Sequence, residues 1–134
     1  MTAPSATTRH LRTWLGRALA VTWLGAFLAT HVPAEKVPDV HVTDKTLHAV
    51  GYFVLATLLL AWLAARGVRR IRRATIAIVA LAVYGAIDEA TQPLVQRHAS
   101  IEDWLADLAG VLAAAIVCEL LLALFARPGQ PPRT

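Results

Sequence analysis

The sequence predicts an all-α protein, an integral membrane bundle of four transmembrane helices with both termini in the cytoplasm. Apolar residues make up 57% of the 134 residues and only 16% are charged, which is too apolar for an ordinary soluble domain. The apolar residues gather in four runs, each close to the roughly 20 residues that a helix needs to cross a bilayer. Most basic residues lie beside these runs, as is typical of membrane proteins. The length allows one domain, which we place at 13–126, between a cytoplasmic flank at 1–12 and a tail at 127–134.

The first run, 13–30, follows the polar flank and is apolar apart from Arg17. Its length favours a transmembrane helix. A secretory signal peptide is the alternative, because a basic start and an apolar core precede Val32-Pro33-Ala34, which resembles a cleavage site. Cleavage there would leave the topology of the other runs unchanged.

The second run, 47–65, follows a loop at 31–46 and ends before Gly67. We expect the next segment to be a basic loop with five arginines: Arg66, Arg69, Arg70, Arg72 and Arg73. We interpret this loop as a signal that orients the chain in the membrane. It is also compatible with lipid headgroups, and it requires no nucleic acid.

The third run, 74–95, is apolar in its first half and polar on one side in its second half, where Pro93 ends or kinks the helix. The fourth run, 103–126, carries small residues that suit close contact between helices: Ala106, Gly110, Ala113 and Ala114. The tail that follows is rich in proline, and we expect it to be disordered.

The basic residues orient the bundle, because cytoplasmic loops are rich in Lys and Arg. Ten of them lie on the side that holds both termini: Arg9, Arg12, Arg17, Arg66, Arg69, Arg70, Arg72, Arg73, Arg127 and Arg133. Three lie on the other side: Lys36, Lys45 and Arg97. The sequence therefore predicts a multi-pass protein of the cell inner (plasma) membrane that contacts the lipid bilayer and no nucleic acid. Its loops at 31–46 and 96–102 face outward.

Polar residues concentrate where three of the runs meet this outer side. A carboxylate at the centre of a bilayer costs about 2.5–3.5 kcal/mol, so carboxylates inside apolar runs indicate pairing, a water-filled pocket or chemistry. With the predicted orientation, the polar ends of the second, third and fourth runs lie in one layer of the outer leaflet. We expect the following residues to share a pocket there: Asp44, Lys45, His48, Tyr52, Glu89, Gln92, Arg97, Ser100, Asp103 and Asp107.

The residue types in this layer suit proton transfer or the binding of an anion. A histidine that is hydrogen-bonded to a carboxylate is poised for proton transfer, so we assign candidate catalytic roles to His48, Glu89 and Asp103. We assign the others to ligand binding: Asp44, Lys45, Tyr52, Gln92, Arg97, Ser100 and Asp107. Arg97 offers a planar fork for a phosphate or carboxylate. The carboxylates and the histidine could also hold a hard or borderline cation, and the sequence identifies no cofactor or metal.

Structural roles are the alternative for several of these residues. Thr43 and Asp44 are suited to the start of a helix, and Ser100 with Asp103 matches a capping box. His48 and Tyr52 could be anchors at the membrane interface. Another group sits inside the runs, where we expect no capping role: Glu89, Gln92 and Asp107. Asp88 points about 100° away from Glu89, toward the surface or another helix.

Together the motifs resemble the VanZ-like family. The pattern D-K-x-x-H-x-x-x-Y begins at Asp44, E-x-x-Q begins at Glu89, and R-x-x-S-x-x-D begins at Arg97. The family pattern continues with D-x-x-x-N-x-x-G, and here Asp107 replaces the asparagine. The resemblance covers about residues 40–115. It implies a small multi-span bacterial membrane protein that acts in the cell envelope, in a family whose founding member is associated with reduced susceptibility to teicoplanin-type glycopeptides.

Three functions follow as hypotheses. The outer pocket could bind or modify an envelope molecule, such as a lipid-linked or anionic ligand, or the protein could be a non-catalytic binding or accessory subunit. Whether it is an enzyme stays open, because the same histidine and carboxylates serve both. A small ion- or proton-coupled transporter is the third hypothesis, and it is disfavoured because the inner half of the runs offers only Arg17 and Glu119. We expect these two charges to pair with each other.

Overall fold

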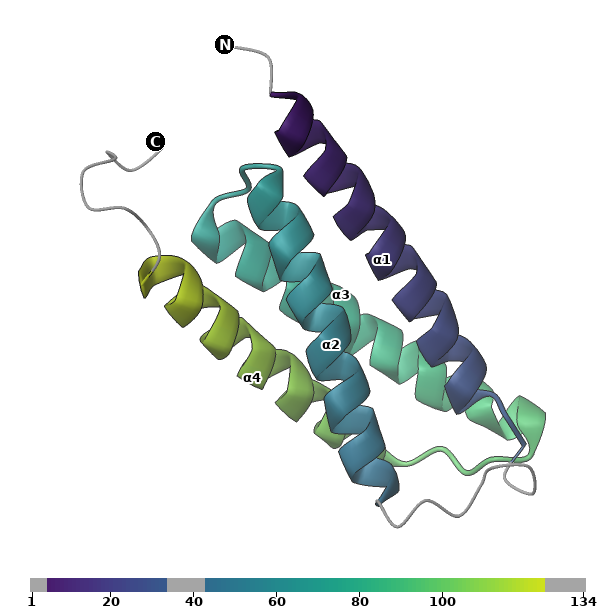
Figure 1. Ribbon diagram of the computed structural model, residues 1–134. Helices are drawn as coiled ribbons and strands as arrows, with labels where there is room; N and C mark the ends of the chain where they lie inside the picture. Colours follow the sequence, from purple (N-terminus) through teal and green to yellow (C-terminus); the bar gives the residue numbers. More distant parts are fainter. Residues whose placement is uncertain (1–4, 34–42, 125–134) are drawn as a thin grey trace.

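The computed structural model describes residues 5–33 and 43–124, which form four α-helices and one short 3-10 helix, with no strand among these residues (Figure 1). Their bounds are α1 Ala6–Thr30, α2 Asp44–Ala65, α3 Arg70–Thr91, η2 Gln92–Val95 and α4 Ile101–Leu124. The predicted all-α class is confirmed. Three segments are long and apolar enough to cross a membrane, namely α2, α3 continued by η2, and α4. The predicted tail at 127–134 and much of the predicted loop at 31–46 lie outside the described residues.

The helices begin earlier than the apolar runs, because polar caps and arginines extend them. Ser5 caps α1, whose first turns lie within the predicted cytoplasmic flank. Thr43 caps α2 by accepting a hydrogen bond from the backbone N–H of Thr46, as we expected. Helix α3 starts at Arg70, so the later arginines of the predicted basic loop are helical. Only a short turn separates α2 from α3, and Gly67 in this turn has the positive φ of 79° that favours glycine.

The end of α3 follows the prediction for Pro93. The α-helix stops at Thr91 and gives way to η2, which contains Pro93. Gln96 then adopts a left-handed conformation with φ 61°, which turns the chain toward α4. Ser100 caps α4, because its side chain accepts a hydrogen bond from the backbone N–H of Asp103.

Helix α2 packs against all three other helices and forms the centre of the core. It buries Leu55, Leu60 and neighbouring residues against Leu81 of α3 and Val111 of α4. In α1, by contrast, only Leu19 is buried. The outer faces of the helices keep many large apolar side chains exposed, which suits contact with lipid.

Helices α2 and α4 approach each other closely at Gly110 on α4. A Cβ atom on this glycine would lie 2.1 Å from the carbonyl oxygen of Ala49 on α2. Ala114 lies one turn later on the same side of α4 and is buried. The prediction of a small face on the fourth helix is therefore right for Gly110 and Ala114. It is wrong for Ala113, which is exposed, because the buried side of α4 extends toward Val111 and Ala115 instead.

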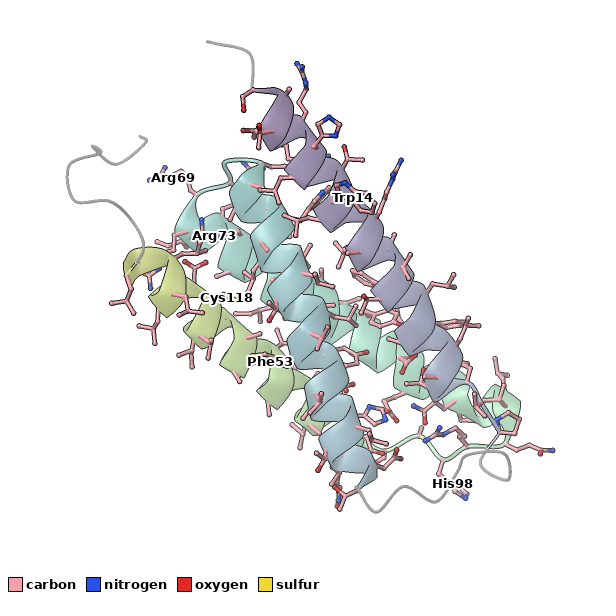
Figure 2. All side chains as sticks on the ribbon, viewed as in Figure 1. Trp14, Phe53, Arg69, Arg73, His98 and Cys118 are labelled. Carbon is pink, nitrogen blue, oxygen red and sulfur yellow. The ribbon has the colours of Figure 1, made fainter. Side chains whose placement is uncertain are left out.

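The bundle has two chemically different ends. One end holds the start of α1, the turn between α2 and α3, and the end of α4, and Arg69 and Arg73 lie there (Figures 1 and 2). His98 lies at the opposite end (Figure 2). At the basic end, the Nε of Arg12 donates a hydrogen bond of 2.8 Å to the carbonyl of Ala65, which satisfies a free carbonyl at the end of α2.

The predicted pair between Arg17 and Glu119 is wrong. Two nitrogens of Arg73 each donate a hydrogen bond of 2.6 Å to the carboxylate of buried Glu119, and Arg70 lies 3.3 Å from it. Arg17 instead places its guanidinium over the ring of Trp14. The reason is position: Glu119 faces the start of α3, and Arg70 and Arg73 are one helical turn apart on the same face.

Candidate functional site

Three helices bring one ionisable side chain each to a common point in the interior. His48 of α2 places Nδ1 2.9 Å from Oδ1 of Asp107 on α4 and 3.9 Å from Oε1 of Glu89 on α3. The three side chains are only 4%, 1% and 8% exposed, respectively. The sequence predicted a carboxylate partner for His48, and the structure assigns Asp107 to that place. Burial also argues against the alternative that His48 and Tyr52 are anchors at the membrane interface.

Glu89 also has a structural role that we did not expect. Its Oε2 accepts a hydrogen bond of 2.7 Å from the backbone N–H of Ser100, just before α4. Its Oε1 accepts a hydrogen bond of 3.1 Å from the side chain of Gln92. The prediction that Glu89 has no capping role is therefore wrong, whereas the side chain of Gln92 contacts Glu89 and caps no helix in the described residues. A carboxylate suits this place because it accepts hydrogen bonds strongly at a helix N-terminus, where backbone N–H groups are free.

Two ion pairs lie at this end of the bundle, and only one of them borders the cavity. Nη2 of Arg97 donates a hydrogen bond of 3.2 Å to Oδ2 of Asp44, and the Arg97 side chain is largely buried whereas Asp44 is exposed. Lys45 pairs with Glu102, and both side chains are exposed. An exposed pair of this kind contributes little to stability, about 0–1 kcal/mol. The structure thus places Asp44 and Arg97 beside the interior group and leaves Lys45 at the surface.

A cavity of about 330 Å³ reaches this layer between α1 and α2. Its lining combines small and apolar residues with polar ones: Ala26, Ala29, Thr30, Val32, Asp44, Leu47, His48, Gly51, Tyr52 and Arg97. Four predicted site residues therefore line one cavity, namely Asp44, His48, Tyr52 and Arg97. The other predicted residues do not line it, and Glu89 and Ser100 line a separate hollow beside Trp104.

A further buried carboxylate, Asp88, belongs to the same end of the bundle and was not among the predicted site residues. Its Oδ1 accepts a hydrogen bond of 2.9 Å from the hydroxyl of Thr30 on α1, and Nδ1 of His31 lies 3.7 Å away. Nε2 of His31 lies 3.0 Å from the hydroxyl of Thr91. Asp88 thus faces α1, which is one of the two possibilities that its angle from Glu89 allowed. The polar Thr30 and His31 at the end of an apolar run were the signal that could have identified this cluster.

Two tyrosines, Tyr52 and Tyr84, lie near the carboxylates of Asp88 and Asp107. The rings of Tyr52 and Tyr84 stack with centroids 5.9 Å apart, and Trp23 of α1 packs edge-on against Tyr84. Both tyrosine hydroxyls are buried without a hydrogen-bond partner in the described part of the chain. The same holds for Oδ2 of Asp88 and Oδ2 of Asp107. Buried polar atoms normally have a partner, so these four oxygens indicate a place where polar groups or ions can be bound.

Within residues 5–33 and 43–124, two sets of side chains could hold a metal ion. In one set the ligand atoms of His48, Glu89 and Asp107 lie within 4.8 Å of one another. In the other set the ligand atoms of Asp44, His48 and Asp103 also lie within 4.8 Å of one another. His48 belongs to both sets, so an ion in either place would lie beside the cavity that His48 lines.

The geometry also defines how His48 can act. Because Asp107 holds Nδ1, the orientation of the His48 ring is fixed. The other ring nitrogen, Nε2, has no hydrogen-bond partner among residues 5–33 and 43–124, which the structure describes. A ligand in the cavity could therefore exchange a hydrogen bond or a proton with Nε2.

No family model, curated protein or solved structure matches this chain. The likeness to the VanZ-like family rests on the motif residues and their spacing.

Proposed function

We propose that this protein is a VanZ-like membrane protein that binds an anionic, lipid-linked molecule of the cell envelope in an outer-leaflet pocket. One observation carries the proposal: the cavity between α1 and α2 combines an apolar wall with His48 and Arg97. An apolar wall suits a lipid chain, and a guanidinium beside an imidazole suits a phosphate or carboxylate headgroup. The VanZ-like motif supplies these same two residues.

The loose packing of α1 supports entry of a lipid into the cavity directly from the membrane. Only Leu19 of α1 is buried, so this helix is held less firmly than the others. Leu47 lines the cavity and is also exposed on the outside of α2, which makes the apolar wall continuous with the surface that we assign to lipid. A lipid could therefore slide in between α1 and α2 without first leaving the bilayer.

The exposed partner of Arg97 supports the binding of an anion. Asp44 holds one side of the guanidinium at the rim, where water can replace it at low cost. A headgroup phosphate would compete with Asp44 for Arg97 and gain a stronger, charge-assisted contact.

A catalytic role for the same pocket is the second candidate, and the pair between His48 and Asp107 favours it. This pair orients an imidazole with Nε2 available to the cavity, which is the arrangement of a general base. A transporter has less support, because Glu119 in the inner half is neutralised by Arg73 and Arg70. A link to teicoplanin-type glycopeptides follows only from the family resemblance.

Binding of a defined lipid to the detergent-purified protein tests the proposal. Native mass spectrometry would compare a polyisoprenyl phosphate with the matching neutral polyisoprenol. We expect the phosphate to bind in preference, and Arg97→Gln to weaken its binding about tenfold or more, which corresponds to the loss of one charge-assisted hydrogen bond.

Arg69→Gln is the matched control, because Arg69 is an exposed arginine at the opposite end of the bundle (Figure 2). This variant should bind the phosphate like the unaltered protein. Equal binding of the phosphate and the alcohol, or equal loss in both variants, would contradict a headgroup site at Arg97. Release of a chemically altered lipid during incubation would favour the catalytic candidate.

A further inference from the structure

We propose that His48, Glu89 and Asp107 form a binding site for one divalent transition-metal ion of the Mn²⁺ or Zn²⁺ type. The proposal goes beyond lipid binding and does not depend on it. Its starting point is the convergence of an imidazole and two carboxylates from three different helices in the interior of the bundle.

The distances within this group suit a shared ion. Nδ1 of His48 lies 2.9 Å from Oδ1 of Asp107 and 3.9 Å from Oε1 of Glu89. Ligand atoms that each bind one ion at about 2.0–2.2 Å lie about 3–4 Å from one another. A hydrogen bond explains only the shorter distance, because 3.9 Å is too long for one. Both distances are compatible with a shared ion, and the same nitrogen, Nδ1, faces both carboxylates.

The balance of charge in the surroundings favours a cation. Four carboxylates are buried at this end of the bundle: Asp88, Glu89, Asp103 and Asp107. The basic groups that face them in the described segments are His48 and His31, while Arg97 is engaged with Asp44 at the rim. A buried carboxylate that stays ionised needs pairing or a bound metal, so a divalent ion would offset charge that two histidines do not.

A separate observation concerns oxygens without partners. Oδ2 of Asp107 and the hydroxyl of Tyr52 are buried and unpaired, and both side chains are more than nine-tenths buried. A Cβ atom on Gly85 would lie 3.0 Å from this Oδ2 and 3.3 Å from the Tyr52 hydroxyl, so both oxygens face the same place. The unpaired oxygen belongs to the carboxylate that contacts His48, so Asp107 can bind an ion through both oxygens. The Tyr52 hydroxyl can hold a water molecule of the ion.

The donor set selects the type of ion. An imidazole nitrogen with carboxylate oxygens suits Mn²⁺ and Zn²⁺, whereas Mg²⁺ and Ca²⁺ prefer oxygen ligands alone. The cysteine at position 118 takes no part, because its Sγ faces Thr57 along the bundle. Asp107 stands where the VanZ-like pattern has an asparagine, so the proposed site is a property of this chain and not of the pattern.

The test uses the full-length protein in detergent, freed of metal by a chelator and titrated with Mn²⁺. The electron paramagnetic resonance signal of free Mn²⁺ reports binding. We expect one ion per chain, displaced by Zn²⁺ at a lower concentration, because a site with an imidazole binds Zn²⁺ more tightly than Mn²⁺, and not displaced by Mg²⁺ or Ca²⁺. Asp107→Asn and Glu89→Gln should each weaken binding about tenfold or more.

Two further variants separate this site from its neighbours. Glu102→Gln removes an exposed carboxylate at the same end of the bundle and should leave the affinity unchanged. Asp103→Asn affects the other possible set, formed with Asp44 and His48, and should weaken binding less than Asp107→Asn does. Loss of binding in Asp103→Asn with retention in Asp107→Asn would overturn the assignment.

Measurements of thermal unfolding show whether each variant is folded, so that loss of binding is not caused by misfolding. Mn²⁺ should raise the unfolding temperature of the unaltered protein, because an ion that binds only the folded state stabilises it. The shift should disappear in Asp107→Asn, or in Glu89→Gln if the first variant does not fold. Absence of binding by the folded unaltered protein, or binding that survives both substitutions, would overturn the proposal.

Discussion

Buried carboxylates at the two ends of this bundle are stabilised in different ways. Glu119 is held by two arginines of α3, which neutralise it fully. Asp107 has only His48 as a direct partner, and one of its oxygens has no partner in the described chain. A charge that is fully paired serves structure, whereas an intramembrane carboxylate that is incompletely paired indicates function. The difference supports placing the functional site at the end that holds His48.

The pairing of Glu119 gives a prediction at the scale of single residues. Glu119→Arg should destabilise the protein by about 3–5 kcal/mol, because it leaves uncompensated charges of one sign inside the bundle. Adding Arg73→Glu should restore most of this loss, since the two charges are then exchanged in place. Unfolding in mixed detergent micelles would measure the free energies.

Arg17→Glu combined with Glu119→Arg is the matched control for that exchange. Because Arg17 lies over Trp14 and not beside Glu119, this pair should show no rescue. Rescue by Arg17→Glu, without rescue by Arg73→Glu, would contradict the observed pairing.

At the scale of helices, the contact between α2 and α4 fixes the site. Gly110 lets the two backbones approach so closely that a Cβ atom would overlap the carbonyl of Ala49. Asp107 lies one turn before Gly110 on the same helix, and His48 directly precedes Ala49 on α2. The close approach therefore sets the distance between His48 and Asp107. Helix α1 buries only Leu19 and covers the cavity more loosely.

We predict that Gly110→Ala destabilises the bundle by about 1–3 kcal/mol, because the new methyl group forces α2 and α4 apart. Gly25→Ala is the control, since a Cβ atom there meets nothing within 4 Å. That variant should be neutral or more stable, by up to about 1 kcal/mol, because alanine favours the helix. Equal stability of the two variants would mean that the close contact does not limit packing.

At the scale of the whole molecule, successive helices run in opposite directions, and this separates a basic end of the bundle from the end that holds His48. Each helix crosses the bundle, so the start of α1, the turn after α2 and the end of α4 share one end (Figure 1). The arginines gather there and predict the cytoplasmic side. We propose on this basis that α1 is a fourth span, which places the cavity and Arg97 in the outer leaflet of the inner membrane.

Labelling with a membrane-impermeant maleimide tests this topology in a background with Cys118→Ser. His98→Cys should react in cells whose envelope layers outside the inner membrane have been made permeable to the reagent and whose inner membrane is intact. Arg69→Cys should react only after the inner membrane is permeabilised, because the two residues lie at opposite ends of the bundle (Figure 2). The reverse pattern would mean that the orientation is inverted. Labelling of both cysteines without permeabilisation would mean that the chain does not cross the membrane between positions 69 and 98.

The sequence by itself determined the order of the helices and several of their ends, because the signals for them are local. Apolar runs long enough for a membrane, the cap at Thr43, the break at Pro93 and the turn at Gly67 all act within a few residues. The sequence also predicted that polar residues of three helices would share one end, since the direction of each helix follows from the order of the spans.

Only the tertiary structure decided which residues face one another. The rotation and neighbours of each helix depend on packing with the others, and the periodicity of a single helix does not reveal them. For this reason the sequence misassigned the partner of Glu119 and placed Ala113 in a contact face. For the same reason it left open which helix, if any, holds Asp88, and it did not predict that the cavity beside His48 opens between α1 and α2.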